Sequence, residues 1–136
     1  MNFSKLEKQL IQHEGERLHP YFCPAGKLSL GIGRNIEDKG ISREESRFLL
    51  WNDIQESFKY LKRYFPEFSN YPENIQHVMV DMILNLGPGG FLKFRKMIDA
   101  IEAQNWPKMA KEMKDSNWYH QVKSRAKNLI KMVNEI

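Results

Sequence analysis

The sequence contains little cysteine and no long apolar run. Its 136 residues include one cysteine, Cys23, so no disulfide can form within the chain, and the class of small disulfide-stabilised proteins is excluded. The uncharged stretches are far too short to cross a bilayer, so no stable membrane insertion is expected. The first ten residues lack the apolar core and cleavage site of a secretory signal. We therefore expect the chain to be made in the cytoplasm.

Acidic residues are absent between Asp115 and Glu135, where four basic ones occur: Lys123, Arg125, Lys127 and Lys131. The formal net charge of the whole chain is +4. Such an excess favours an anionic partner, and nucleic acid, an acidic cell-wall polymer and anionic lipid all qualify. A basic helix face that is simply solvated is the alternative.

Helical periodicity covers most of the sequence. Phe3, Leu6 and Leu10 predict a first helix that stops at Gly15. Ser42 and Glu45 form a capping box that opens a long second helix. A third helix is expected to begin near Pro72 and to end at Gly87–Gly90. A fourth is expected from Phe91 to Ile101 and a fifth from Trp106 to Met113. One or two more are expected within 118–136. The tryptophans at 51, 106 and 118 are interpreted as core residues.

Residues 17–34 break this periodicity. Leu28, Leu30 and Ile32 alternate with small or polar residues, which predicts a strand in a hairpin or three-stranded sheet. The turn is expected at Pro24–Lys27. The fold class is therefore α+β. We expect one domain over 1–136, with a small β lobe at about 15–41 and a helical lobe formed by 1–14 and 42–136.

Glu14 is the first candidate for chemistry. It stands at the end of the first helix, where the partial negative charge of the helix terminus disfavours an ionised carboxylate. A carboxylic acid that stays protonated near neutral pH is what a general acid needs. An ordinary surface glutamate is the alternative.

The spacing around Glu14 carries a resemblance. Cys23 follows Glu14 after eight intervening residues, and Ser29 follows Cys23 after five, within Ser-Leu-Gly-Ile-Gly. This segment resembles glycoside hydrolase family 24, the phage-type lysozymes, in which a helix-ending Glu-Gly is followed at these distances by Asp, or sometimes Cys, and by Thr. A second region, which includes 81–87, Ser116–Gln121 and Arg125-Ala126, looks like the family's core helix, Trp-Tyr helix and arginine. The resemblance covers roughly 3–36 and 42–134.

The resemblance implies roles for particular residues. Glu14, Cys23 and Ser29 would be catalytic, with Glu14 protonating the leaving oxygen and the other two acting on a water molecule. The implied substrate-binding residues are Gly33, Asn35, Leu84, Gln121 and Arg125. Arg125 would also reach back to Glu14, and its charge would then favour the ionised carboxylate, against the effect of the helix end.

Three departures from the family pattern stand out. Cys23 replaces the commoner Asp, Ser29 replaces Thr, and Arg34 stands where a His is common. An unperturbed thiol is mostly protonated at pH 7, so Cys23 needs a lowered pKa to act as a base, and a buried packing role is its alternative. Residues 35–41 form a short bridge where longer family members insert many residues.

The implied function is a peptidoglycan hydrolase, an endolysin-type muramidase that cleaves the β-1,4 bond between N-acetylmuramic acid and N-acetylglucosamine and causes bacterial lysis. A lytic transglycosylase on the same polymer needs only one acid/base carboxyl and stays open. A non-catalytic wall-binding module with the same fold is the third possibility. A nucleic-acid binder would leave the spacing of Glu14, Cys23 and Ser29 unexplained.

The expected partner is bacterial peptidoglycan, with no nucleic acid, and the chain is expected to be a monomer. The four histidines show no spacing typical of metal ligands, so neither a metal nor a cofactor is expected. An enzyme made in the cytoplasm needs a separate pore or export system to reach the wall.

Overall fold

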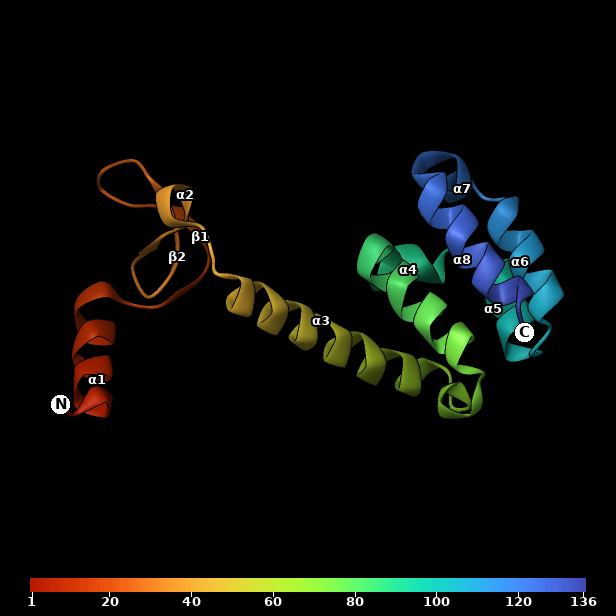
Figure 1. Cartoon of the computed structure of the whole chain (residues 1–136), viewed down its shortest axis with the longest axis horizontal. Coiled ribbons are helices and arrows are strands. Elements are labelled where there is room, and N and C mark those ends of the chain that lie inside the picture. Colours follow the sequence, from red (N-terminus) through yellow and green to blue (C-terminus); the bar gives the residue numbers. More distant parts are fainter. The chain divides into compact units, whose positions relative to one another are not determined.

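The computed structural model covers all 136 residues, and its contacts divide the chain into two units, Met1–Phe48 and Leu49–Ile136. The N-terminal unit contains five elements (Figure 1): helix α1 (Phe3–Glu14), strands β1 (Arg17–Phe22), β2 (Leu28–Gly31) and β3 (Arg34–Asn35), and helix α2 (Ile36–Lys39). Helix α3 (Arg43–Tyr64) begins in this unit and runs on into the C-terminal unit.

Local chemistry explains both ends of α1. The side chain of Asn2 accepts a hydrogen bond from the Lys5 amide and caps the first turn. Gly15 has φ +71° and donates its N–H to the Ile11 carbonyl, which ends the helix directly after Glu14. The helix end predicted from the sequence is therefore confirmed.

The three strands form an antiparallel sheet in the order β1-β2-β3. Ser29, in the middle strand, is opposite Tyr21 on one side and Asn35 on the other. The predicted turn at Pro24–Lys27 is confirmed, because the Cys23 amide donates to the Lys27 carbonyl and Gly26 adopts φ +79°. Ser29 is the one buried residue of this unit.

Helix caps organise the segment after the sheet. Asn35 accepts from the Asp38 amide and starts α2, a helix at a place where the sequence indicated only a short bridge. The predicted capping box is confirmed, because Ser42 Oγ accepts from the Glu45 amide and Glu45 accepts from the Ser42 amide.

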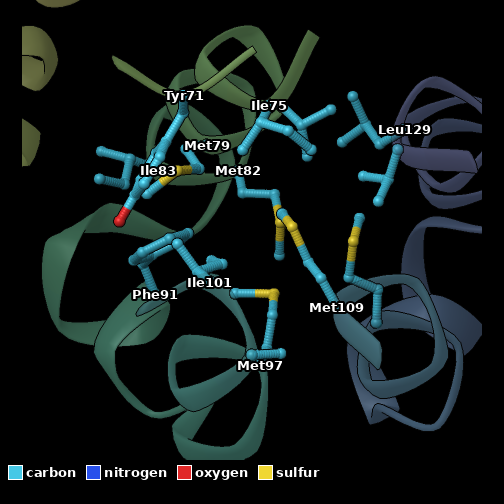
Figure 2. Packing of buried hydrophobic residues seen from close by; sticks show 14 of the residues in the cluster. Tyr71, Ile75, Met79, Met82, Ile83, Phe91, Met97, Ile101, Met109 and Leu129 are labelled. Atoms are coloured by element: carbon cyan, nitrogen blue, oxygen red, sulfur yellow. The ribbon is translucent and has the colours of Figure 1, made fainter. Parts of the chain in front are cut away.

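The C-terminal unit is helical and holds the apolar core (Figure 2). After α3 it contains η1 (Phe68–Asn70), α4 (Glu73–Leu92), α5 (Arg95–Glu102), α6 (Trp106–Lys114), α7 (Asn117–Val122) and α8 (Ser124–Asn134). Helix α4 is central to the core, since Ile75, Met79 and Met82 are fully buried. Met97 of α5 and Met109 of α6 close the core around them.

Two predictions about this unit were wrong. The helix that begins near Pro72 is interrupted at Gly87 as predicted, because Gly87 has φ +74° and non-helical backbone, but a further helical turn runs on to Leu92. A proline in the first turn after such an interruption loses no helical hydrogen bond, so Pro88 permits the further turn. The next helix, predicted from Phe91, begins only at Arg95. Trp51 is 57% exposed and lies outside the core, whereas Trp118 is 3% exposed, as predicted.

Mostly helical structure with one small sheet confirms the α+β class. No helix combines the length and hydropathy needed to span a membrane. The predicted assignment of 1–14 to the helical lobe stays a prediction.

Candidate active site

Glu14 lies against the start of strand β3. Gly33 has φ +64°, and a Cβ atom at this position would lie 2.5 Å from Glu14 Oε2 and 2.7 Å from its Cδ. Only a glycine allows the carboxyl to approach the backbone this closely. The structure therefore brings together Glu14, at the end of α1, and Gly33, one of the residues predicted to bind substrate.

Cys23 and Ser29 flank the turn between β1 and β2. The Lys27 carbonyl accepts from the Cys23 amide at 2.9 Å and from Ser29 Oγ at 3.1 Å, so both candidate residues are held by the same backbone group. Cys23 is half-buried, and Ser29 is 2% exposed. The thiol is therefore neither fully exposed nor sealed inside a core.

The surroundings of Cys23 lower the pKa of its thiol. The largest cause is hydrogen bonding with the backbone at Lys27, which favours the thiolate. Partial burial works in the opposite direction, and smaller contributions from the Ala25 backbone and the Ser29 hydroxyl again lower the pKa. A Cys23 that acts as a base needs such a lowered thiol pKa.

Asn35 and Arg34 have structural partners. The Asn35 side chain accepts from the Asp38 amide and donates to its carboxylate at 3.0 Å, and its role in substrate binding stays a prediction. Arg34 pairs with Glu45 at 2.6 Å. The sequence indicated only a capping role for Glu45. No local spacing could indicate the ion pair, because it joins a strand to a helix.

Leu84 and Gln121 line two different hollows of the C-terminal unit. Leu84 borders a pocket of about 250 Å³ between α3 and α4, together with Asp53 and Tyr60. Gln121 borders a wider groove of about 930 Å³ that also includes Trp118 and Phe94. Their roles in substrate binding stay predictions.

The wider groove is rich in basic side chains. Four of them line it, and none of the four forms an ion pair: Lys93, Arg95, Lys96 and Lys111. Two acidic side chains, Glu112 and Asp115, also border it. The groove therefore carries an excess of unpaired positive charge.

Arg125 pairs within the C-terminal unit. Its Nε donates to Asp81 Oδ1 at 2.7 Å, and one of its terminal nitrogens donates to the Asp81 carbonyl. Glu14 belongs to the N-terminal unit, and the expected contact between Arg125 and Glu14 stays a prediction. Nearby in sequence, Trp118 Nε1 donates to Asn85 Oδ1 at 2.8 Å, a second link between α4 and the last helices.

No three His, Cys, Asp or Glu side chains lie close enough together to hold a metal ion. In the N-terminal unit, Glu14, Cys23 and Ser29 supply a carboxyl, a thiol of lowered pKa and a hydroxyl. A carboxyl and an ionisable second group are typical equipment for acid/base hydrolysis of a glycosidic bond.

Comparison with known proteins gives the family. The model of the phage lysozyme family matches residues 11–133. A probable T4-type lysozyme 1 of Dictyostelium discoideum is 25% identical over 160 residues, which cover 96% of this chain and 94% of that protein. This alignment is longer than the chain, so that relative carries residues that this chain lacks.

A second similar protein is the pre-baseplate central spike protein Gp5 of Enterobacteria phage T4. It is 31% identical over 156 residues, which cover 94% of this chain and 27% of that protein. Lysozymes are glycosidases that act on peptidoglycan. Since the family model matches most of the chain, this protein belongs to the phage lysozyme family.

Proposed function

We propose that this protein hydrolyses the β-1,4 bond between N-acetylmuramic acid and N-acetylglucosamine in peptidoglycan. The observation that carries the proposal is the arrangement of the N-terminal unit, where the Glu14 carboxyl rests against Gly33 and the connection between β1 and β2 carries a thiol of lowered pKa. Family membership supports this assignment.

Glu14 is the general acid of the proposed reaction. In its protonated form it donates a proton to the oxygen that leaves as the glycosidic bond breaks, so that the departing sugar becomes a neutral alcohol. Glu14 is the last residue of α1, and its carboxyl lies against Gly33.

Cys23 is the general base. As a thiolate it accepts a proton from a water molecule while the water oxygen attacks the anomeric carbon from the face opposite the leaving group, which inverts the configuration. The Ser29 hydroxyl donates its proton to the Lys27 carbonyl, and its oxygen accepts a hydrogen bond from the water and orients it. After the reaction Glu14 is ionised and Cys23 is protonated, and proton exchange with solvent restores both.

The groove of the C-terminal unit suits the same substrate. The peptides of peptidoglycan carry free carboxylates, and the unpaired Lys93, Arg95, Lys96 and Lys111 supply opposite charge. We propose that this groove, with Gln121, binds the peptide part of the polymer.

We also propose that the protein acts as a monomer and lyses bacteria after it leaves the producing cell through a separate pore or export system. Peptidoglycan hydrolysis from outside a Gram-negative cell then requires a permeabilised outer membrane. Added protein should clear a suspension of permeabilised cells and leave intact cells turbid.

The test compares Glu14→Gln with Glu16→Gln on purified peptidoglycan. Glu16 is an exposed carboxylate two residues away in the same unit, so the two variants change the charge equally. Loss of a general acid lowers a rate typically 10²- to 10⁴-fold, and we expect this loss for Glu14→Gln alone. The measurement is the release of new reducing ends.

Two results would contradict the proposal. Full activity of Glu14→Gln would remove the assigned acid. Products that end in anhydromuramic acid in place of reducing ends would show that no water is added, and the protein would then be a lytic transglycosylase.

A further inference from the structure

Glu45 joins strand β3 to the start of helix α3. Its Oε1 accepts from Arg34 Nη1 at 2.6 Å and from the Ser42 amide at 2.8 Å. The backbone hydrogen bond at Ser42 and then the bond from Arg34 lower the pKa of Glu45 to about 2, so this carboxylate is ionised at any pH at which the protein works.

Arg34 stands directly beside the backbone that touches Glu14. It is the first residue of β3 and is opposite Leu30 in β2. Gly33 precedes it, and the Glu14 carboxyl lies against Gly33. Because Gly33 and Arg34 share a peptide bond, whatever fixes Arg34 also fixes the surface on which the carboxyl rests.

We propose that Arg34 and Glu45 form a positioning pair that holds Gly33 in place against the Glu14 carboxyl. This inference rests on the proposed function, since it assigns Glu14 to the reaction. Neither residue of the pair touches the reacting atoms. The pair acts through the backbone of β3, and its removal lets β3 and the carboxyl shift together.

The chain offers a matched pair that lacks this connection. Glu37 accepts from the Leu28 amide at 3.2 Å and pairs with Lys27 at 3.4 Å, so it makes the same two kinds of contact as Glu45. It lies in α2 and does not adjoin Gly33. Because Leu28 precedes Ser29, a substitution at Glu37 can change the rate, but it should leave the Glu14 carboxyl in place, and this position is what the control reports.

The experiment measures kcat and KM on purified peptidoglycan fragments for Glu45→Gln, Arg34→Met, Arg34→Lys and Glu37→Gln. Glutamine still caps α3 but cannot form the ion pair. A displacement of about 1 Å at a reacting group lowers a rate up to about 10²-fold. We expect a fall in kcat of about tenfold or more for Glu45→Gln and Arg34→Met, with KM unchanged.

Three further results are expected. Arg34→Lys should restore much of the lost kcat, because it keeps the charge. The double variant Arg34→Met/Glu45→Gln should be no worse than either single variant, since both remove one interaction. The melting temperatures of all variants should stay close to that of the parent.

A readout without turnover covers the case in which the proposed function is wrong. The ¹³C resonance of the Glu14 carboxyl should shift in Arg34→Met and Glu45→Gln and stay in place in Glu37→Gln. Unchanged kcat and an unchanged resonance in Arg34→Met would overturn the positioning pair, and so would an equal shift of the Glu14 resonance in Glu37→Gln. Full activity of Glu14→Gln, with the resonance shifts as expected, would instead overturn the proposed function and leave the pair in place.

Discussion

The N-terminal unit buries one serine, whereas every buried apolar side chain of the protein lies in the C-terminal unit. Three of the five ion pairs, two helix caps and the capping box belong to the N-terminal unit, which is smaller. The C-terminal unit instead packs methionines and aromatic rings from several helices around α4. The unit that carries the candidate catalytic residues is thus fixed by directional polar contacts.

This difference fits two separate needs, the stability of the fold and the precise placement of catalytic groups. Burial of apolar side chains provides most of the free energy of folding, but it is not directional. Hydrogen bonds and close backbone contacts place a carboxyl or a thiol to within a fraction of an ångström, which acid/base chemistry requires. Substitutions in the two units should therefore have different consequences.

The largest effect on stability is expected from Phe91→Ala. Phe91 is fully buried and meets the edge of Phe65 in the core. Truncation of a buried phenylalanine costs about 3–5 kcal/mol, a large part of the stability of a small domain. Chemical denaturation gives the free energy of unfolding. The control is Phe22→Ala in β1, since Phe22 is 72% exposed and should cost under about 0.5 kcal/mol. Equal losses in the two variants would contradict the comparison.

Gly33→Ala should lower the stability less than Phe91→Ala does, and it should lower the activity more. The added Cβ would displace the Glu14 carboxyl, so we expect a loss of activity of about 10- to 100-fold. The control is Gly40→Ala, where φ is +66° and the added Cβ would meet no atom within 4 Å. Both variants suffer the strain of a left-handed residue, about 1–2 kcal/mol. If Gly40→Ala loses as much activity as Gly33→Ala, backbone strain explains the loss and the contact with Glu14 does not.

The smallest effect is expected at the exposed ion pair of Arg125 and Asp81. A double-mutant cycle with Arg125→Met and Asp81→Asn should give a coupling energy of about 0.2–1 kcal/mol, measured by thermal denaturation. Lys127, on the same helix, forms no ion pair and serves as the control in a cycle with Asp81. A coupling energy of zero between Arg125 and Asp81 would leave Arg125 free for the contact with Glu14 that the family resemblance implies.

Local sequence rules predicted most of the fold. The end of α1 at Gly15, the turn before Lys27 and the capping box at Ser42 each depend on neighbours within four residues, so they could be read from the sequence. The further helical turn from Gly87 to Leu92 could not, because the packing of those residues decides whether a Gly-Pro segment is followed by another turn. The exposure of Trp51 likewise depends on which elements cover α3, and not on its periodicity.

The candidate site was predictable in its residues but not in its contacts. The spacing of Glu14, Cys23 and Ser29 indicated the three residues through the family resemblance. The contact of Glu14 with Gly33, the pairing of Arg34 with Glu45 and the lowered pKa of Cys23 all depend on how strands and helices meet in space. Such contacts between distant segments leave no periodic signal in the sequence.

The pH dependence of peptidoglycan hydrolysis by Cys23→Ala and Cys23→Asp tests most directly whether Cys23 and Glu14 work as base and acid. The lowered pKa of Cys23 predicts that the pH profile of the parent protein has a limb from thiolate formation, at a lower pH than an ordinary thiol would give. Cys23→Ala should lose about 10²- to 10⁴-fold in rate. Cys23→Asp should stay active without that limb, because an aspartate is already ionised there. Full activity and an unchanged pH profile in Cys23→Ala would contradict the assignment, and Cys23 would then be a packing residue.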